Sequence, residues 1–274
     1  MGVEAPPEDV GTVRQFRQHA RQRAITETVM KEGAVRIERL AERFGVSVMT
    51  VHRDLDELES RGLLRKDRGV AIATSTALVE SSDVYRSSRQ LAEKEAIAGA
   101  ATSFVEPGQA IMLDDSTTTL HLVPHLSAKA PITVITNTMT IMEQLRSTRG
   151  VTLLGVGGRY FSWCSSFMGR MAIETIESLR ADLLIMSTAA ITDDIAYHQT
   201  LETVDVKRAM FASSRRRILM ADHTKFDKHA LHALLPLSDF DVIIVDAATD
   251  REHVARLQDK VETVVVAKRG VHPR

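Results

Sequence analysis

The hydrophobic pattern of the chain changes once, near residue 90. Before residue 72 the apolar positions follow helical spacing, whereas after residue 93 short apolar runs alternate with amphipathic or polar stretches long enough for a helix. Alternating buried strands and helices are typical of an α/β domain with a mainly parallel sheet. The pattern predicts a small domain over residues 13–72 and an α/β domain over residues 92–274, joined by a serine-containing linker over residues 73–91.

The apolar runs of the second domain mark its expected strands. They lie at residues 111–113, 132–135, 151–154, 183–186, 218–220, 242–245 and 264–266. Ligands of parallel α/β sheets bind beyond the carboxyl ends of the strands. Polar residues that directly follow these runs are therefore the candidate ligand contacts.

The first domain is expected to contain two short helices separated by a tight turn, after a long helix over residues 13–32. The turn is centred on Gly45, and Ser47 is placed to cap the exposed N–H groups of the next helix. Val51, Leu55 and Leu58 are spaced i, i+4 and i+7, so they should form the buried stripe of that helix.

The opposite face of this helix carries side chains suited to DNA, and the basic segment 62–70 predicts a two-strand wing. A helix-turn-helix presents its second helix to the major groove in this way. The expected partner is a double-stranded DNA operator, and the alternative is an ordinary helical hairpin with a solvated face. The candidate DNA contacts are Ser47, Met49, Thr50, His52, Arg53, Arg65, Lys66 and Arg68.

Polar or glycine-rich segments follow several of the predicted strands. Hydroxyl groups beside free backbone N–H groups at a strand-to-helix junction form a phosphate cradle, and a lysine or arginine nearby adds a cation. Helix capping is the alternative role for the hydroxyl cluster, and a salt bridge with Asp222 is the alternative for the lysine. The candidate ligand contacts are Asp115, Ser116, Thr117, Thr118, Thr119, Asn137, Gly157, Gly158, Arg159 and Lys225.

Composition adds limits to this interpretation. The net charge of the 274-residue chain is -1, but residues 14–68 carry thirteen Lys and Arg against nine Asp and Glu, enough for a modest positive local field. The single cysteine, Cys164, excludes an internal disulfide. No membrane-spanning stretch or signal-peptide core is evident, so a cytoplasmic protein without a membrane partner is expected.

Metal chemistry is not expected from the histidines. His121 and His125 have helical metal-ligand spacing, but Pro124 interrupts the stretch, and packing or surface roles are favoured. No metal and no cofactor are predicted.

Residues Glu38 to Leu55, with Thr50-x-x-Arg53-Asp54-Leu55, resemble the DeoR family of bacterial transcriptional regulators. Segments 93–98, 113–119, 133–137, 157–158, 167–169, 206–210 and 222–226 are similar to the sensor domain of that family, so the resemblance covers roughly residues 15–250. It implies a sensor with a fold related to ribose-5-phosphate isomerase that responds to phosphorylated sugars. Carried over by position, Asp115, Thr117, Thr118 and Thr119 line the pocket, with Asn137, Gly157, Gly158 and Lys225 around it.

The chain departs from the family pattern at several positions. His52 stands where the family usually has arginine, and Arg68 and Ser116 stand where it usually has glycine. Residues 187–191 also add side chains to a loop expected to face the ligand. Neither the operator sequence nor the identity of the sugar can therefore be carried over.

The resulting hypothesis is a transcriptional regulator, favoured as a repressor, of carbohydrate metabolism genes. It is expected to be a homodimer or homotetramer assembled through residues 93–274, and the direction of its response to the effector is left open. One alternative is a sugar-phosphate isomerase with an added DNA-binding head, with Asp114 or Asp115 as the base. Another is a nucleic-acid binder whose second domain serves only for oligomerisation.

Overall fold

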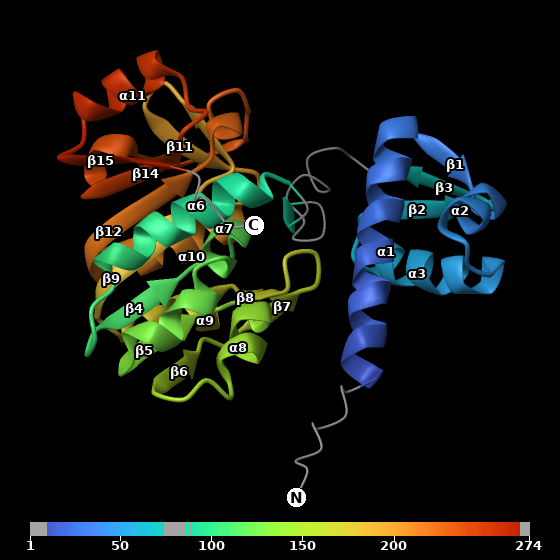
Figure 1. Ribbon diagram of the computed structural model, residues 1–274, viewed down its shortest axis with the longest axis horizontal. Helices are drawn as coiled ribbons and strands as arrows, with labels where there is room; N and C mark the ends of the chain where they lie inside the picture. The colour runs from blue at the N-terminus through green and yellow to red at the C-terminus, as the bar shows by residue number, and fades with distance from the viewer. Residues whose placement is uncertain (1–9, 74–85, 88, 269–274) are drawn as a thin grey trace, which may run out of the picture. The chain divides into compact units, whose positions relative to one another are not determined.

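The computed structural model describes residues 10–73, 86–87 and 89–268 (Figure 1). The chain divides into two compact units, residues 1–88 and 89–274. Most of the predicted linker lies outside the described residues. Within the described part, no helix combines the length and the apolar character needed to cross a bilayer.

The first unit is a helix-turn-helix with a small antiparallel sheet. Its elements are α1 (Val10–Glu32), β1 (Ala34–Arg36), α2 (Ile37–Phe44), α3 (Val48–Ser60), β2 (Leu64–Asp67) and β3 (Val70–Ala73). The sheet order is β1-β3-β2. The predicted two-strand wing is therefore widened by β1, which was not predicted because three residues carry too little periodicity.

The predicted buried stripe of α3 is confirmed. Val51, Leu55 and Leu58 are fully buried and pack with Leu40 of α2 and Ile25 of α1 in one apolar cluster. A short helix held by such a cluster gains its stability from packing rather than from intrinsic propensity. The core therefore fixes which face of α3 remains outside.

The second unit is built on a seven-stranded parallel sheet of order β15-β14-β12-β9-β4-β5-β6. Its strands are β4 (Ala110–Leu113), β5 (Ile132–Thr136), β6 (Val151–Gly155), β9 (Ala181–Ser187), β12 (Ser214–Ala221), β14 (Val242–Asp246) and β15 (Thr263–Ala267). Each predicted apolar run lies within one of these strands. The predicted mainly parallel α/β sheet is confirmed.

Helices cover both faces of this sheet (Figure 1). One apolar cluster joins Ile111 and Leu113 of β4 to α6 (Leu91–Ala101), α8 (Met139–Leu145) and the 3₁₀ segment η2 (Val123–Lys129). The other joins Met112 to α9 (Arg170–Glu177), α10 (Leu201–Ala212) and α11 (Arg251–Gln258). Successive strand residues point to opposite faces. Because both faces of this sheet are covered by helices, its strands contain largely apolar runs rather than a regular alternation of polar and apolar residues.

Shorter elements lie between the main strands and helices. They are η1 (Thr102–Phe104), α7 (Thr117–Leu120), η3 (His223–Lys225), η4 (Leu237–Asp239), the hairpin β7 (Arg159–Phe161)–β8 (Ser166–Met168), and the antiparallel sheet of β10 (Ala190–Thr192), β11 (Ile195–His198) and β13 (His232–Pro236). Neither the hairpin nor the small sheet was predicted from the sequence.

The strand order reverses beside β4. The chain runs outward from β4 through β5 to β6 and then returns to β9, on the other side of β4. Loops that follow β4 and β9 therefore lead in opposite directions. In open α/β sheets ligands bind at this kind of reversal, outside the carboxyl ends of the strands.

Candidate DNA-binding surface and ligand site

The start of α3 is fixed by the turn before it. Gly45 has a left-handed backbone (φ 61°), which ends α2, and the Ser47 hydroxyl accepts a hydrogen bond from the Thr50 N–H at 3.1 Å. The predicted cap is confirmed. An N-cap serine satisfies a backbone donor that the helix itself cannot pair.

The outer face of α3 presents the predicted DNA-binding side chains. Met49 is 62% exposed, Arg53 is also exposed, and Thr50 and His52 are partly exposed. Acidic residues of the same helix face other elements instead: Asp54 is buried and accepts from Arg21 of α1 at 2.5 and 3.2 Å. This pairing removes one negative charge from the side of α3 that is available to DNA.

The wing ends in a two-residue turn. Arg68 (φ 45°) and Gly69 (φ 80°) connect β2 to β3, which pair through Asp67 and Val70. Two consecutive positive φ angles define the hairpin turn that glycine and asparagine favour, so an arginine there is strained. Arg68 is exposed at the tip.

The other two basic wing residues differ from each other. Arg65 is exposed. Lys66 forms an ion pair with Asp56 of α3, and its N–H donates to the Glu59 carboxylate at 2.8 Å. Lys66 therefore holds the wing against α3, and part of its charge is already neutralised by Asp56.

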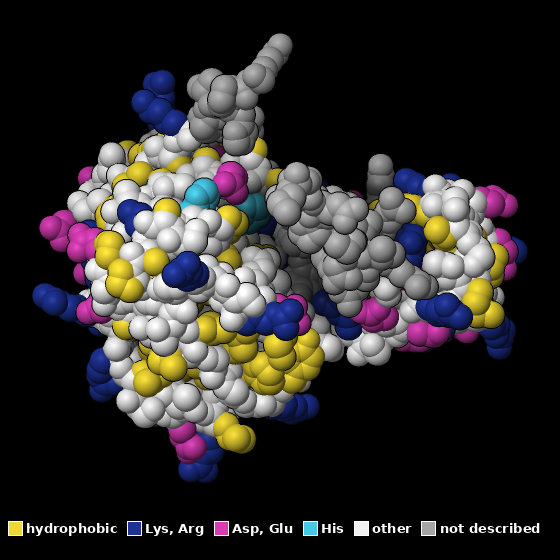
Figure 2. Space-filling model, turned by 60° about the horizontal axis from the view of Figure 1, so that its bottom comes forward, with side chains coloured by type: hydrophobic (Ala, Val, Ile, Leu, Met, Phe, Trp, Pro, Cys, Tyr) yellow, Lys and Arg dark blue, Asp and Glu magenta, His cyan; other side chains and the backbone are white. Residues whose placement is uncertain are grey.

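Basic and acidic side chains are interspersed on the surface that Figure 2 shows. Over residues 14–68 the sequence carries an excess of only four positive charges, thirteen Lys and Arg against nine Asp and Glu. Recognition by a few residues of α3 and the wing fits this distribution better than broad electrostatic binding.

Asp114 lies at the centre of the site at the carboxyl end of the large sheet. One of its oxygens accepts from the Ser116 N–H (3.1 Å) and the Thr119 hydroxyl (2.8 Å), and the other from the Ser187 N–H (2.9 Å) and the Lys207 ammonium. The carboxylate is 1% exposed. Asp114 therefore joins the loops after β4 and β9 and has little acceptor capacity left.

Lys207 completes this network from α10, which covers the face of the sheet opposite to α6. Its ammonium lies 3.2 Å from Asp115 Oδ1 and donates to the Ser187 carbonyl at 3.1 Å. Lys207 is 1% exposed. A buried ammonium needs such partners, because an unpaired charge in the interior is costly.

The hydroxyl groups after β4 divide into two roles. Ser116 caps α7 by accepting from the Thr119 N–H at 3.1 Å, so Ser116 and Thr119 build the loop itself. Thr117 accepts from the Lys94 ammonium of α6 at 3.0 Å. Thr118 is buried beside them, at 2% exposure. Helix capping is thus the role of Ser116, whereas Thr117 is the residue of this cluster whose hydroxyl accepts from a lysine.

Two lysines lie close to a second carboxylate, Asp222, at the end of β12. Lys225 is 3.8 Å from Asp222. Burial alone would raise the pKa of Asp222, but the charges of Lys225 and Lys94, together with the hydrogen bond from Thr224, lower it below its ordinary value. Asp222 is therefore ionised at neutral pH, and the predicted alternative of a pair between Lys225 and Asp222 is present.

Asn137, directly after β5, is held by β8. Its side-chain amide donates to the Phe167 carbonyl at 2.8 Å, and the Phe167 N–H donates back to the Asn137 carbonyl at 2.8 Å. Asn137 and Asp115 are both buried, and each retains an oxygen without a hydrogen-bond partner among the described residues.

The glycine-rich segment after β6 was predicted to contact the ligand, and the structure shows a packing role for one of its glycines. A Cβ on Gly158 (φ 146°) would lie 2.8 Å from the Met168 carbonyl oxygen and 3.2 Å from Ala172, so glycine is needed for packing there. Gly157 and Arg159 are exposed, and the Arg159 guanidinium lies over the Phe161 ring at 5.1 Å. No contact in the described residues joins Arg159 to the buried lysines.

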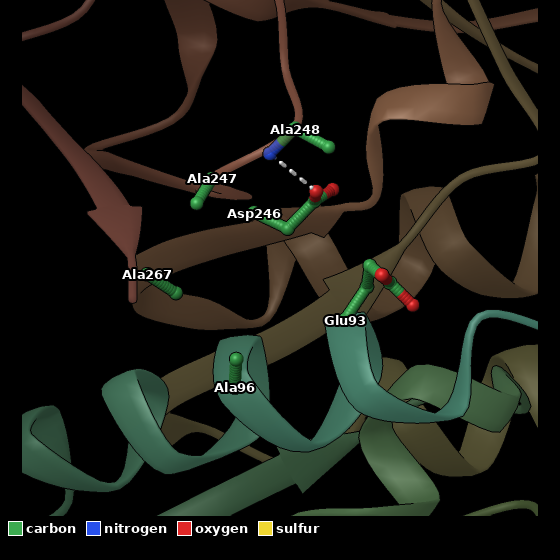
Figure 3. A pocket seen from close by; sticks show the side chains of 6 residues that line it. All are labelled: Glu93, Ala96, Asp246, Ala247, Ala248 and Ala267. Atoms are coloured by element: carbon green, nitrogen blue, oxygen red, sulfur yellow. Dashed lines mark hydrogen bonds between the residues drawn. The ribbon is translucent and has the colours of Figure 1, made fainter. Parts of the chain in front are cut away.

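A cavity of about 220 Å³ lies against α6 at the ends of β14 and β15 (Figure 3). It is lined by Glu93, Ala96, Asp246, Ala247, Ala248 and Ala267. Asp246 accepts from the Ala248 N–H and from His223. The carboxylates of Glu93 and Asp246 would repel a phosphate group in this cavity. The cations Lys94 and Lys225 are better suited to bind one.

The two histidines with metal-ligand spacing both contact one carboxylate on α6. His121 and His125 each have a ring nitrogen 3.1 Å from Glu95. All three side chains are at least partly exposed. The spacing thus serves a polar cluster between α6 and the segment after α7.

Four side chains of this cluster are absent from the ligand contacts predicted from the sequence. One is Asp114, which was considered only as the base of the isomerase alternative. Lys94 and Lys207 lie in segments noted for family resemblance, and Asp222 was considered only as a partner of Lys225. The missed signal was a lysine in line with the buried positions of each of two helices: Lys94 precedes Ile97 and Ala98 by three and four positions, and Lys207 precedes Met210 and Phe211 in the same way. Such a lysine is expected to be buried only where a carboxylate or hydroxyl receives it.

Together these features define a winged helix-turn-helix protein with an α/β sensor-type domain. The DeoR-like helix-turn-helix domain matches residues 21–77, and the DeoR C-terminal sensor domain matches residues 89–247. The chain belongs to the DeoR family of transcriptional regulators.

Curated relatives match nearly the whole chain. Transcriptional repressor AccR of Agrobacterium fabrum is 36% identical over 231 residues, which cover 84% of this chain and 90% of that protein. The lactose phosphotransferase system repressor of Staphylococcus aureus is 30% identical over 249 residues, 90% of this chain and 98% of that protein. Ribose 5-phosphate isomerase A of Methanocaldococcus jannaschii aligns with a TM-score of 0.36 and 10% identity, over 48% of this chain and 53% of that chain.

Proposed function

We propose that this protein is a repressor of carbohydrate metabolism genes whose operator affinity is set by a phosphorylated sugar bound in the second unit. The observation that carries the proposal is the exposed face of α3, with Met49 and Arg53 outside and the acidic Asp54 turned inward. Family membership and a relative named as a lactose phosphotransferase system repressor support the regulated process.

On DNA, α3 enters the major groove and the wing contacts the backbone. Thr50, His52 and Arg53 reach base edges or nearby phosphates, and Ser47 and Met49 lie at the same end of the helix. Arg65 and Arg68 contact phosphates, whereas Lys66 contributes mainly by positioning the wing through Asp56.

In the second unit, the effector phosphate is received between Lys94, Thr117 and Lys225. Lys225 lies 3.8 Å from Asp222 and Lys94 donates to Thr117, and the charges of both lysines lower the pKa of Asp222, which supports a common positive field at this edge of the sheet. A phosphate would compete with Asp222 for these cations, and the hydroxyl of Thr117 adds a neutral donor. Lys207 is engaged with Asp114 and Asp115 and serves to hold the two loops.

The same contacts favour a binding site over the alternative of an isomerase. Proton abstraction from a sugar carbon requires a carboxylate free to act as a base. Asp114 is saturated by four donors and therefore does not fit the role of that base. Asp115 keeps one oxygen open, and the relatives named as transcriptional repressors favour ligand binding over catalysis at this oxygen. We infer that the protein is a regulator and not an enzyme.

The repressor acts as a homodimer or homotetramer in the cytoplasm, where bacterial operators lie. Two symmetric heads match paired half-sites, and one winged helix-turn-helix alone rarely gives tight specific binding. Because the first unit is committed to DNA, the second unit supplies the subunit contacts.

The test combines DNA binding with effector binding. The full-length protein is titrated against the region upstream of its own gene in a gel shift, with and without a panel of sugar phosphates. One sugar phosphate should change operator affinity by a coupling free energy of about 1–3 kcal/mol. Specific DNA binding that no phosphorylated compound alters would instead support a second unit that serves only for oligomerisation.

A further inference from the structure

Two buried oxygen atoms at the carboxyl ends of β4 and β5 have no hydrogen-bond donor among the described residues. They are Asp115 Oδ2 and Asn137 Oδ1, in residues that are 4% and 1% exposed. Buried acceptors in native proteins are nearly always paired, and an exception calls for a partner outside the protein.

The surrounding contacts determine which kind of group can be that partner. One N–H of the Asn137 side-chain amide donates to the Phe167 carbonyl at 2.8 Å, and its Oδ1 is the side-chain atom left without a partner among the described residues. Asp115 Oδ1 is 3.2 Å from the Lys207 ammonium, which leaves Oδ2 as a second acceptor. Both open positions therefore require a hydrogen-bond donor.

The two acceptors belong to one cluster of loops. β4 and β5 are adjacent and parallel, with Leu113 opposite Thr136, so the loops that hold both acceptors begin side by side. The Thr138 hydroxyl donates to the Asp114 carbonyl at 3.3 Å and ties the loop after β5 to the loop after β4. A single small molecule at this edge of the sheet can thus meet both.

The charge of the surrounding groups decides which ligand groups fit these acceptors. Lys207 carries one positive charge and faces both Asp114 and Asp115, so these three groups together keep a net negative charge. A hydroxyl group of the ligand can donate to the open acceptors without adding negative charge. A carboxylate on the ligand would face two acceptor oxygens and be repelled. The cations Lys94 and Lys225, which would attract it, are proposed above to hold the phosphate.

We propose that Asp115 and Asn137 recognise hydroxyl groups at the non-phosphorylated end of the effector and discriminate against a carboxylate there. The effector class is then a phosphorylated sugar or polyol, and phosphorylated sugar acids are excluded. This inference rests on the proposed function, in which a phosphorylated sugar binds at the same edge of the sheet.

The experiment compares matched pairs of ligands on the full-length protein by titration calorimetry. Suitable pairs are glucitol 6-phosphate with 6-phosphogluconate, ribitol 5-phosphate with 5-phosphoribonate, and glycerol 3-phosphate with 3-phosphoglycerate. In any pair that binds, the alcohol should bind at least about tenfold more tightly, as expected for loss of a hydrogen bond to a charged group. The Asp115→Asn variant should bring this ratio close to one, because its amide can donate to a carboxylate.

Inorganic phosphate is the control for the other end of the site. Asp115→Asn and a second variant, Asp115→Ser, should retain the wild-type affinity for inorganic phosphate, and a cooperative unfolding transition shows that each variant is folded. A carboxylate member that binds as tightly as its alcohol, or a ratio unchanged in both variants, would overturn the proposal.

The two levels of inference fail separately. Phosphate binding that depends on Lys225 without any discrimination between the paired ligands removes only the role of Asp115 and Asn137. Failure of inorganic phosphate and of all six esters to bind removes the proposed function, and this inference with it.

Discussion

Side chains of the same type have different roles in this protein, depending on the partners that surround them. Of the lysines at the ligand site, Lys207 pairs with Asp114 and Asp115. Lys94 donates to Thr117 and Lys225 pairs with Asp222, and the charges of Lys94 and Lys225 both lower the pKa of Asp222. The same contrast holds on the first unit, where Arg53 is exposed and Arg21 is paired with a buried carboxylate.

Arg53→Ala should weaken specific operator binding by about 1–3 kcal/mol, the worth of a base contact. The first unit should keep its fold, because Arg53 lies outside the apolar cluster of α3. Fluorescence anisotropy with operator and with unrelated DNA measures the effect. The exposed Arg146→Ala in the second unit is the matched control, and equal affinities of the two variants would exclude Arg53 from the DNA contact.

Lys225→Ala should lower the affinity for the effector about tenfold to a hundredfold, since a charge-assisted hydrogen bond contributes roughly 1.5–3 kcal/mol. Operator binding without effector should remain at the wild-type level. Titration calorimetry with the active sugar phosphate gives the affinity. Lys129→Ala, at the end of η2, should leave it unchanged. Full affinity in the Lys225 variant would make Lys225 only the salt-bridge partner of Asp222.

Elements follow from patterns that run over many residues, and elements without such a pattern were missed. The seven apolar runs predicted the seven strands of the large sheet because a strand buried on both faces has few polar positions. The hairpin β7–β8 and the small sheet of β10, β11 and β13 are short and only partly buried, so their composition resembles that of loops.

Arg68 at the tip of the wing combines a strained backbone with a proposed phosphate contact, and a substitution there tests both. Arg68→Gly should raise the stability of the first unit by about 1 kcal/mol, because glycine adopts the left-handed backbone without steric cost. It should also reduce the slope of log affinity against log salt by about one phosphate contact. Hydrogen exchange of β2 and β3 reports the stability. Arg68→Lys should keep the salt slope, and an unchanged slope in the glycine variant would show that the tip does not touch DNA.

The stability of the loops after β4 and β9 should depend on Lys207 of α10. Lys207→Met leaves Asp114 buried without its cation, and breaking such a pair typically costs about 3–5 kcal/mol. Calorimetric unfolding of the second unit should shift to lower temperature. The double variant Lys207→Met with Asp114→Asn should recover part of the loss, because only Asp115 is then left without the cation. A single variant as stable as the wild type would mean that water or another cation replaces Lys207.

At the scale of the whole molecule, function requires that two separately folded units influence one another. Each unit has its own apolar cluster, so each can change state as a body. Linkage then demands that an effector which alters operator affinity is itself bound with altered affinity in the presence of operator, by the same factor.

Self-association is the prediction that belongs to this scale. Light scattering at micromolar concentration should give a mass at least twice that of the 30.3 kDa chain. The mass of the second unit expressed alone over residues 89–274 should double in the same way, because the subunit contacts are placed there. A monomer both free and on operator DNA would contradict the proposed pairing of half-sites.

The sequence by itself determined the class of the protein. Periodic apolar positions set the two units and the parallel sheet, and Ser47, Gly45 and the stripe of Val51, Leu55 and Leu58 set the recognition helix. These features depend on neighbours within a few residues or on repetition along an element. Local physics was therefore enough to predict them.

Only the tertiary structure decided how the site divides its charges. Lys94 lies 23 positions from Thr117, and Lys207 lies 93 positions from Asp114. No spacing rule connects such distant residues, because their meeting depends on the order of strands in the sheet. The same folding used Ser116, Thr119 and Gly158 for local structure and left Asp115 and Asn137 with open acceptors.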